Sequence, residues 1–206
     1  MSGSARELVL VRHGRSAHVE AGWLNADGLR RWMTAYDAAE IALHHPPPSE
    51  LRALTDQAAR VVASDLPRAA ASAQLLAPGR VIERSMLLRE TPLETAARPL
   101  PSLGGLRLPL RGWALVIGAR WLAGWRPGAL PPGADAQARD RAAEAAGWLV
   151  TLAEETPGRV VVVTHTTFRL LLAQALLERG WRGPKRRPFH VWSAWRFTPG
   201  ADRGTD

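Results

Sequence analysis

The sequence predicts a three-layer α/β/α sandwich around a mainly parallel central sheet. Two apolar runs, 8–11 and 160–163, have the β-branched and leucine residues that are typical of strands buried on both faces. Helical segments alternate with strands along the chain, which favours parallel strands joined by helices on both faces of the sheet. The chain has 206 residues, of which 46% are hydrophobic, and this is enough for a single domain with a substantial core.

The elements follow from apolar runs and the residues that interrupt them. Strands are predicted at about 7–12, 60–63, 81–82, 159–163 and 191–197. Helices are predicted at about 27–43, 49–58, 65–76, 113–125, 134–155 and 167–179. The triplet Pro46–Pro48 ends the first helix, and Asp65 is expected to cap the third, with Pro67 in its first turn. An insertion rich in Pro, Gly and Trp is expected at about 91–133, and a disordered tail at about 198–206.

Composition limits the kind of protein. The formal charge is +8, almost all from arginine because Lys185 is the only lysine. This charge favours anionic partners, although a compositional bias toward Arg, Ala, Gly and Pro explains it equally well. With no cysteine, disulfides and thiolate metal sites are excluded, as expected in a reducing compartment. The first strand begins within about seven residues and leaves no room for a signal peptide, so a cytoplasmic location is expected.

Both long apolar runs end on a histidine. The first leads into Arg12-His13-Gly14 and the second into Thr164-His165. In an open α/β sheet, ligands bind at the carboxyl ends of the strands, so we expect the two imidazoles to meet at one edge of the sheet. Two histidines beside an arginine point to phosphate chemistry, because an arginine presents N–H donors that match phosphate oxygens.

Four short motifs resemble those of a known family. Arg12-His13-Gly14 resembles the Arg-His-Gly signature of the histidine phosphatase superfamily, which has the phosphoglycerate-mutase-like fold. The segment 64–69 is similar to the block that supplies the family's second phosphate-binding arginine, here Arg68. Leu88-Arg89-Glu90 falls where the family has its acid residue, and His165 where it has its second histidine. The resemblance covers about residues 7–177.

The resemblance implies a role for each of these residues. His13 is the expected nucleophile, which forms a phosphohistidine that water then hydrolyses. Arg12 and Arg68 bind the phosphate, and His165 donates to an equatorial oxygen. Glu90 is the expected general acid and later the base, while Glu94, four residues further on, remains the alternative. The reaction implied requires no metal and no other cofactor.

One departure from the family lies beside the second histidine. Thr166 stands where many members have glycine, and Thr166 or Thr167 is expected to give the phosphate a hydroxyl or N–H donor at a helix N-terminus. His44 and His45 adjoin three prolines without a third ligand in the sequence nearby, so they are expected to lie in a solvated loop and not to bind a metal.

The insertion at about 91–133 contains Trp113, Trp121 and Trp125. Its apolar stretch is too short to span a bilayer, and no other transmembrane segment is expected. Three interpretations fit: a lid over the catalytic edge, a patch that forms a homodimer, or a helix at a membrane interface. We favour the lid, because in the resembled family substrate choice usually resides here. The basic cluster at 181–187 is expected to be a solvated loop, without a nucleic-acid partner.

The sequence therefore predicts a phosphomonoester hydrolase that acts on a phosphorylated small molecule through a phosphohistidine. A phosphoglycerate-type phosphomutase needs the same four residues and remains an alternative. A non-catalytic phosphate-binding or scaffold protein that kept the site without turnover is the other.

Overall fold

A six-stranded sheet forms the centre of the protein, with strand order β3-β2-β4-β1-β6-β5. The computed structural model describes residues 6–18, 22–91, 105–123 and 136–200. Four strands run parallel, and these are β1 (Glu7–Arg12), β2 (Arg60–Ser64), β3 (Glu83–Ser85) and β4 (Arg159–Thr164). Strand β6 (Ala194–Pro199) pairs antiparallel with β1, and β5 (Trp181–Arg182) pairs antiparallel with β6. The mainly parallel sheet predicted from the sequence is confirmed.

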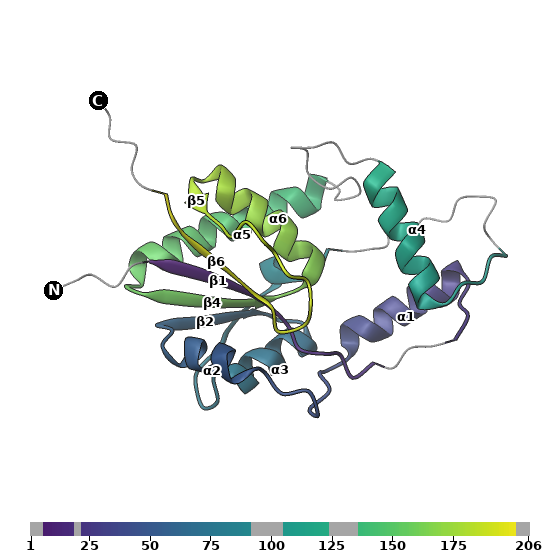
Figure 1. Ribbon diagram of the computed structural model, residues 1–206, viewed down its shortest axis with the longest axis horizontal. Coiled ribbons are helices and arrows are strands. Elements are labelled where there is room, and N and C mark those ends of the chain that lie inside the picture. Colours follow the sequence, from purple (N-terminus) through teal and green to yellow (C-terminus); the bar gives the residue numbers. More distant parts are fainter. Residues whose placement is uncertain (1–5, 19–21, 92–104, 124–135, 201–206) are drawn as a thin grey trace.

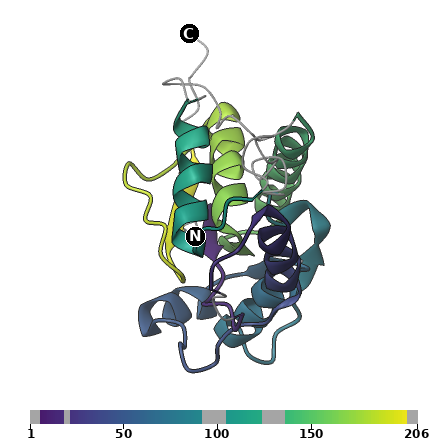
Figure 2. The same ribbon diagram turned by 90° about the vertical axis from the view of Figure 1, so that its right-hand side faces the viewer.

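Helices cover both faces of the sheet (Figure 1). One face carries α2 (Ser49–Asp56) and α3 (Pro67–Leu76), and the other carries α5 (Ala136–Glu155) and α6 (Thr166–Glu178). A 3-10 turn, η1 (Met86–Leu88), follows β3. Two helices lie beyond the carboxyl ends of the strands, α1 (Ala26–Ala38) and α4 (Leu110–Ala123), and Figure 2 shows them in front of that edge.

The alternation of side chains along β1 explains the three layers. Leu8 and Leu10 are buried against α5 and α6, whereas Val9 and Val11 are buried against α2 and α3. Residues 160–163 of β4 divide in the same way, so both central strands are apolar throughout. Outside this core, α1 and α4 pack against each other in a separate small cluster around Ala26, Leu29 and Trp113.

Register between β1 and β4 aligns their carboxyl ends. Arg12 lies opposite Thr164, and the backbone N–H of His13 donates to the carbonyl of Thr164 over 3.0 Å. His13 and His165, more than 150 residues apart in the sequence, therefore follow directly from neighbouring strand ends.

The helix predicted at 27–43 ends earlier than expected, at Ala38. Residues 40–42 instead pair with the loop that follows β1: Ala17 donates to the carbonyl of Glu40 over 2.8 Å, and Ala42 to that of Arg15 over 2.7 Å. This backbone pairing within the tertiary structure outweighs the local preference for helix.

Predicted boundaries near the C-terminus also need correction. The last strand begins at Ala194, not at residue 191, because Trp192 has a φ of 62° and forms a turn. Thr198 and Pro199, which were expected to begin a disordered tail, belong to a strand, since Thr198 pairs with Arg182 and Pro199 with Trp181. The rest of the expected tail, from residue 201, lies outside the described residues. The sequence analysis missed β5, which is two residues long, and with it the partner that orders these positions.

Candidate active site

His13 lies at the centre of the site, directly after β1. Its side chain is enclosed, with 1% of the residue exposed. The ring Nδ1 is 2.7 Å from the carbonyl of Gly14, a contact in which Nδ1–H is the donor. With the proton on Nδ1, the other nitrogen, Nε2, keeps a lone pair, and it accepts from Nε of Arg68 over 3.4 Å. This hydrogen-bond pattern assigns the tautomer that leaves Nε2 nucleophilic.

The pKa of His13 is lowered from its ordinary value of 6.5 to about 3. Burial is the main cause, and the nearby guanidinium of Arg68 adds to it, whereas the hydrogen bond to Gly14 opposes it. His13 is therefore neutral at pH 7, and a larger fraction of it is unprotonated than an ordinary pKa of 6.5 would give.

Gly14 is required by the close approach of Trp192. A Cβ atom at this position would lie 2.4 Å from the indole, closer than such atoms ever pack. The backbone N–H of Gly14 donates to the hydroxyl of Ser72 over 2.9 Å, and that hydroxyl donates to the carbonyl of Arg68 over 2.6 Å. The loop that carries His13 is thus fastened to the helix that carries Arg68.

Arg68 lies in the first turn of α3 and is completely buried. Besides His13, it donates to the carbonyls of Tyr36 and Asp37 over 3.1 and 3.3 Å, and to the Asp37 carboxylate over 2.9 Å. Its guanidinium also lies over the ring of Tyr36, 4.5 Å from the centroid. The C-terminal end of α1 therefore supplies three oxygen atoms that accept hydrogen bonds from Arg68. Asp65, expected to cap α3, instead pairs with Arg89 over 2.8 Å, and Leu66 takes the capping position.

His165 follows β4 and stands immediately before α6. It is completely buried, and its ring centroid lies 5.1 Å from that of His13. Burial and the neighbouring His13 and Arg68 lower its pKa well below 6.5, so the ring is neutral. Neither ring nitrogen has a hydrogen-bond partner among the described residues. Buried polar atoms are nearly always paired in folded proteins. The unpaired ring N–H of His165 is therefore suited to donate a hydrogen bond to an oxygen atom of a ligand.

Glu90 lies at the N-terminus of α6, the helix that begins directly after His165. Its carboxylate accepts backbone N–H groups from Phe168 and Thr91, both over 2.9 Å, and from Thr167 over 3.4 Å. Burial raises its pKa, and these three donors oppose the rise only in part. The carboxyl therefore caps α6 and also holds a proton more readily than an exposed glutamate.

Two side chains hold the segment before Glu90 in place. Arg141 of α5 donates to the carbonyls of Leu87 and Arg89 over 3.0 and 2.7 Å, and to that of Glu90 over 3.2 Å. The hydroxyl of Thr164 donates to the carbonyl of Leu88 over 2.7 Å. The end of β4 thus positions Glu90 as well as His165.

Arg12 is anchored by the loop between β5 and β6. Its guanidinium donates to the carbonyl of Phe189, and its backbone N–H donates to the carbonyl of Ser193 over 3.0 Å. Behind it, the buried Arg169 donates to the Ser193 carbonyl over 2.7 Å and lies 3.7 Å from the ring centroid of Trp195. Burial and the charge of Arg12 lower the pKa of Arg169 to about 9.

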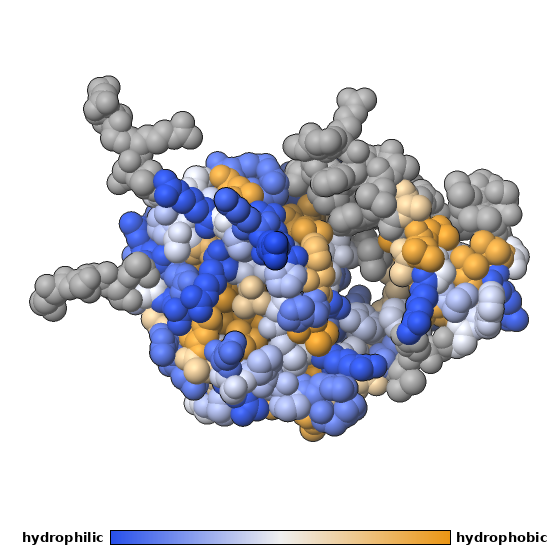
Figure 3. All heavy atoms as spheres, viewed as in Figure 1, coloured by the Kyte–Doolittle hydropathy of each residue, from blue (hydrophilic) through white to orange (hydrophobic). Residues whose placement is uncertain are grey.

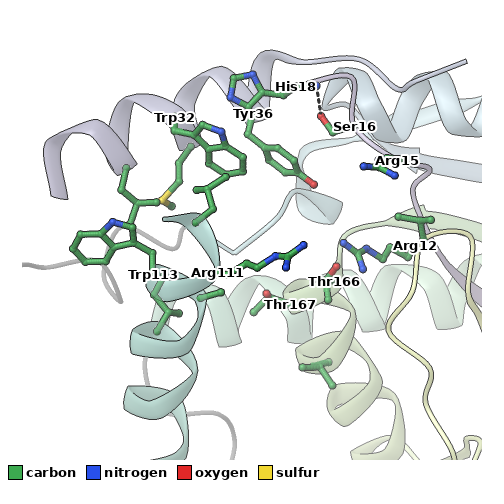
Figure 4. Close-up of a pocket in the computed structure, with 17 residues that line it drawn as sticks. Arg12, Arg15, Ser16, His18, Trp32, Tyr36, Arg111, Trp113, Thr166 and Thr167 are labelled. Atoms are coloured by element: carbon green, nitrogen blue, oxygen red, sulfur yellow. Dashed lines mark hydrogen bonds between the residues drawn. The ribbon is translucent and has the colours of Figure 1, made fainter. Parts of the chain in front are cut away.

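A cavity of about 620 Å³ opens above these residues, between α1, α4 and the N-terminus of α6 (Figure 4). Arg12, Tyr36, Thr166 and Thr167 form the part nearest the strand ends. His13, Arg68, Glu90 and His165 are not among the residues that line it, and of these His13, Arg68 and His165 are fully buried. Tyr36, which lines the cavity, lies edge-on to His13 with ring centroids 6.5 Å apart.

The three tryptophans of the insertion have different places. Trp113 of α4 is 4% exposed, and its indole N–H donates to the carbonyl of Leu24 over 2.8 Å, which ties α4 to the start of α1. Trp121 lies near the end of α4, while Trp125 lies outside the described residues. Glu94, the alternative acid, also lies outside them.

Several residues of the site were missed by the sequence analysis. Trp32 and Tyr36 stack with centroids 5.1 Å apart, a contact that their spacing of four residues on a predicted helix indicates. Ser72, Arg141 and Arg169 act through tertiary contacts and carry no local signal. In the described residues no helix is long and apolar enough to span a membrane, and no three side chains of the usual metal-binding types cluster together.

Comparison with models of protein families finds no match, and comparison with curated proteins finds none either. Solved structures do match. Phosphoglycerate mutase from Bacillus anthracis is 16% identical at a TM-score of 0.53, over 96% of this chain and 89% of that one. YhfR from Bacillus stearothermophilus is 18% identical at 0.53, over 92% and 89%. Phosphoserine phosphatase from Entamoeba histolytica, bound to 3-phosphoglyceric acid, is 16% identical at 0.50, over 84% and 80%. The chain thus has the phosphoglycerate-mutase-like fold that the four motifs predicted.

The lowered pKa of His13 predicts how stability depends on pH. Its pKa in the folded protein, about 3, is below the ordinary 6.5, so the folded protein excludes a proton that the unfolded chain binds. The stabilisation is complete above pH 6.5 and is lost as the pH falls toward 3. In His13→Asn, the free energy of unfolding, measured with urea from pH 7 to 4.5, should fall less steeply by up to about 1.4 kcal/mol per pH unit. Replacement of the exposed His190 with Asn is the control, and an unchanged slope in His13→Asn would contradict the assignment.

Proposed function

We propose that this protein is a metal-independent phosphomonoester hydrolase that acts through a phosphohistidine on His13. The observation that carries the proposal is the neutral imidazole of His13, whose unprotonated Nε2 faces the guanidinium of Arg68 across 3.4 Å. A neutral nitrogen nucleophile and a fixed cation are the two groups that attack on a phosphate dianion requires.

In the first step Nε2 of His13 attacks phosphorus, and the bond from phosphorus to the ester oxygen breaks. Arg12 and Arg68 bind the phosphate oxygens, and His165 donates one ring N–H to them. The phosphate replaces His13 as an acceptor of Arg68, which frees the lone pair of Nε2. Glu90, whose pKa is raised by burial, gives its proton to the leaving alkoxide, so the alcohol departs neutral.

In the second step water attacks the phosphohistidine and the N–P bond breaks. Glu90, now ionised, accepts the proton of the water, and inorganic phosphate leaves with His13 restored to its neutral form. Thr166 and Thr167 begin α6, where the helix dipole and the hydroxyls favour the phosphate charge.

We also propose that α4 is the lid over the site. Backbone hydrogen bonds between Leu24 and Leu108, of 2.8 and 2.9 Å, and the indole N–H of Trp113 hold α4 against α1 above the cavity. Trp113 acts in this arrangement by fixing α4, because almost none of its own surface is free.

One observation favours a phosphomutase as the second candidate. Arg15 and Arg111 line the same cavity as Arg12, and additional cations are what a second phosphate group would need. A mutase would return the phosphoryl group to phosphoglycerate supplied in excess with a primer bisphosphate, whereas a hydrolase releases inorganic phosphate.

Hydrolysis of p-nitrophenyl phosphate in excess EDTA tests the proposed function. The wild type should turn over in EDTA, and His13→Ala should lose about 10³-fold or more in kcat/KM. Circular dichroism of the variant shows whether it is folded. A folded wild type without turnover on any phosphomonoester, or turnover that survives in His13→Ala, would contradict the hydrolase proposed here.

Glu90→Gln tests the general acid, because the amide oxygen still accepts the N–H of Phe168 and keeps the cap of α6. For ethyl phosphate kcat/KM should fall about 10²- to 10⁴-fold, since an alkoxide needs a proton to leave. For p-nitrophenyl phosphate kcat/KM should change only a few-fold, because nitrophenolate leaves without a proton and kcat/KM reports the steps up to the phosphohistidine. Equal losses on both substrates would point to Glu94 or to a structural role of Glu90.

A further inference from the structure

The cavity above the site has two chemically different ends. The end at the strand termini carries the guanidinium groups of Arg12, Arg15 and Arg111. The other end lies between α1 and α4 and is apolar, lined by Leu29, Trp32, Met33, Trp113 and Ile117. Figure 3 shows hydrophobic surface on α4 beside the hollow that separates it from the sheet. A ligand that fills this cavity is therefore anionic at one end and apolar at the other.

Arg111 is a cation that α4 contributes to the lining of the cavity. It lies in the first turn of α4, and in Figure 4 its guanidinium points across the cavity toward Arg12 and Thr166. None of the 17 lining residues is acidic, and Arg111 forms no ion pair within the part of the chain that the structure describes. Two guanidinium groups that face each other repel, and a dianion between them removes this repulsion.

The size of the cavity bears on the rest of the ligand. At about 620 Å³ it is within the range of sites for small organic molecules, and a phosphate group alone fills only a small part of it. Most of the lining of this end is hydrocarbon, and the indole N–H of Trp113 is already bonded to Leu24. Among the described residues, the indole N–H of Trp32 and Nε2 of the adjoining His18 are the buried polar atoms left there without a hydrogen-bond partner, so the end offers few polar atoms to a sugar or an amino acid. Transfer of an apolar group from water to this end of the cavity lowers the free energy of binding.

We propose that the substrate is a phosphomonoester of a bulky apolar alcohol. Arg111 binds the phosphate together with Arg12, and the wall between α1 and α4 takes the alcohol part. The inference rests on the proposed function for the hydrolysis itself, but the binding preference is measurable without turnover.

Ethylphosphonate and hexylphosphonate, which cannot be hydrolysed, are suitable probes, and the tryptophan fluorescence of the wild type reports their binding. Each methylene buried in an apolar site strengthens binding about 4-fold. Hexylphosphonate has four more methylenes than ethylphosphonate, so its Kd should be about 10- to 100-fold lower when two or three of them are buried.

Two sets of variants test the two ends of the cavity separately. Arg111→Gln should weaken the binding of both phosphonates about 10-fold, and Arg111→Lys should recover part of this loss. Arg107 is an exposed arginine on the same segment, so Arg107→Gln should leave both affinities unchanged.

Ala114→Leu, which fills the apolar wall, should reduce the preference for hexylphosphonate over ethylphosphonate. Ala119→Leu, on an exposed face of the same helix, should leave that preference unchanged.

Equal Kd values for the two phosphonates, or an Arg111→Gln variant that binds both like the wild type, would overturn the inference. Tighter binding of 3-phosphonopropionate than of hexylphosphonate would also overturn it, because it would assign the arginines to a second anionic group. If the phosphonates bind as predicted but hexyl phosphate is not hydrolysed, the proposed function alone would be refuted. Hydrolysis of ethyl and hexyl phosphate with equal kcat/KM would refute this inference alone.

Discussion

The parallel pairing of β1 with β4 is the constraint on which the site depends. Because Arg12 lies opposite Thr164, the residues that follow the two strands, His13 and His165, emerge side by side at one edge of the sheet. The same strand end holds the segment before Glu90 through the hydroxyl of Thr164. A shift of one residue in this register would turn the apolar side chains of β1 to the opposite faces of the sheet, so the packing of the core and the geometry of the site are specified together.

Burial and positive charge act together on the ionisable groups. Burial and the nearby Arg68 and Arg12 keep both histidines neutral, which is the form that the proposed mechanism requires of a nucleophile and of a hydrogen-bond donor. Burial has the opposite effect on Glu90, which it helps to stay protonated. One enclosed environment thus favours a neutral base and a neutral acid beside fixed cations, the protonation states that attack on a phosphomonoester needs.

Much of this arrangement follows from the sequence, because local patterns determine it. The apolar runs locate β1 and β4, and their carboxyl ends identify Arg12, His13 and His165 at one edge of the sheet. What the sequence did not predict arises from tertiary contacts. The early end of α1 depends on pairing of residues 40–42 with the loop after β1, and β5 is too short to leave a pattern. Nothing local indicates that the buried Arg169 stands behind Arg12, or that Asp65 pairs with Arg89 instead of capping α3.

In the proposed mechanism the phosphoryl group passes through Nε2 of His13, and a phosphoryl group trapped on this nitrogen would test that step. Glu90→Gln suits the experiment with p-nitrophenyl phosphate, since the first step needs no acid whereas hydrolysis of the phosphohistidine needs the base. Rapid quenching into alkali, in which phosphohistidine survives, followed by mass spectrometry of the peptides, locates the group. We expect a burst of about one nitrophenolate per protein molecule and a phosphoryl group on His13. A phosphoryl group on another residue, or steady turnover with no burst and no phosphorylated peptide, would contradict a phosphohistidine at His13.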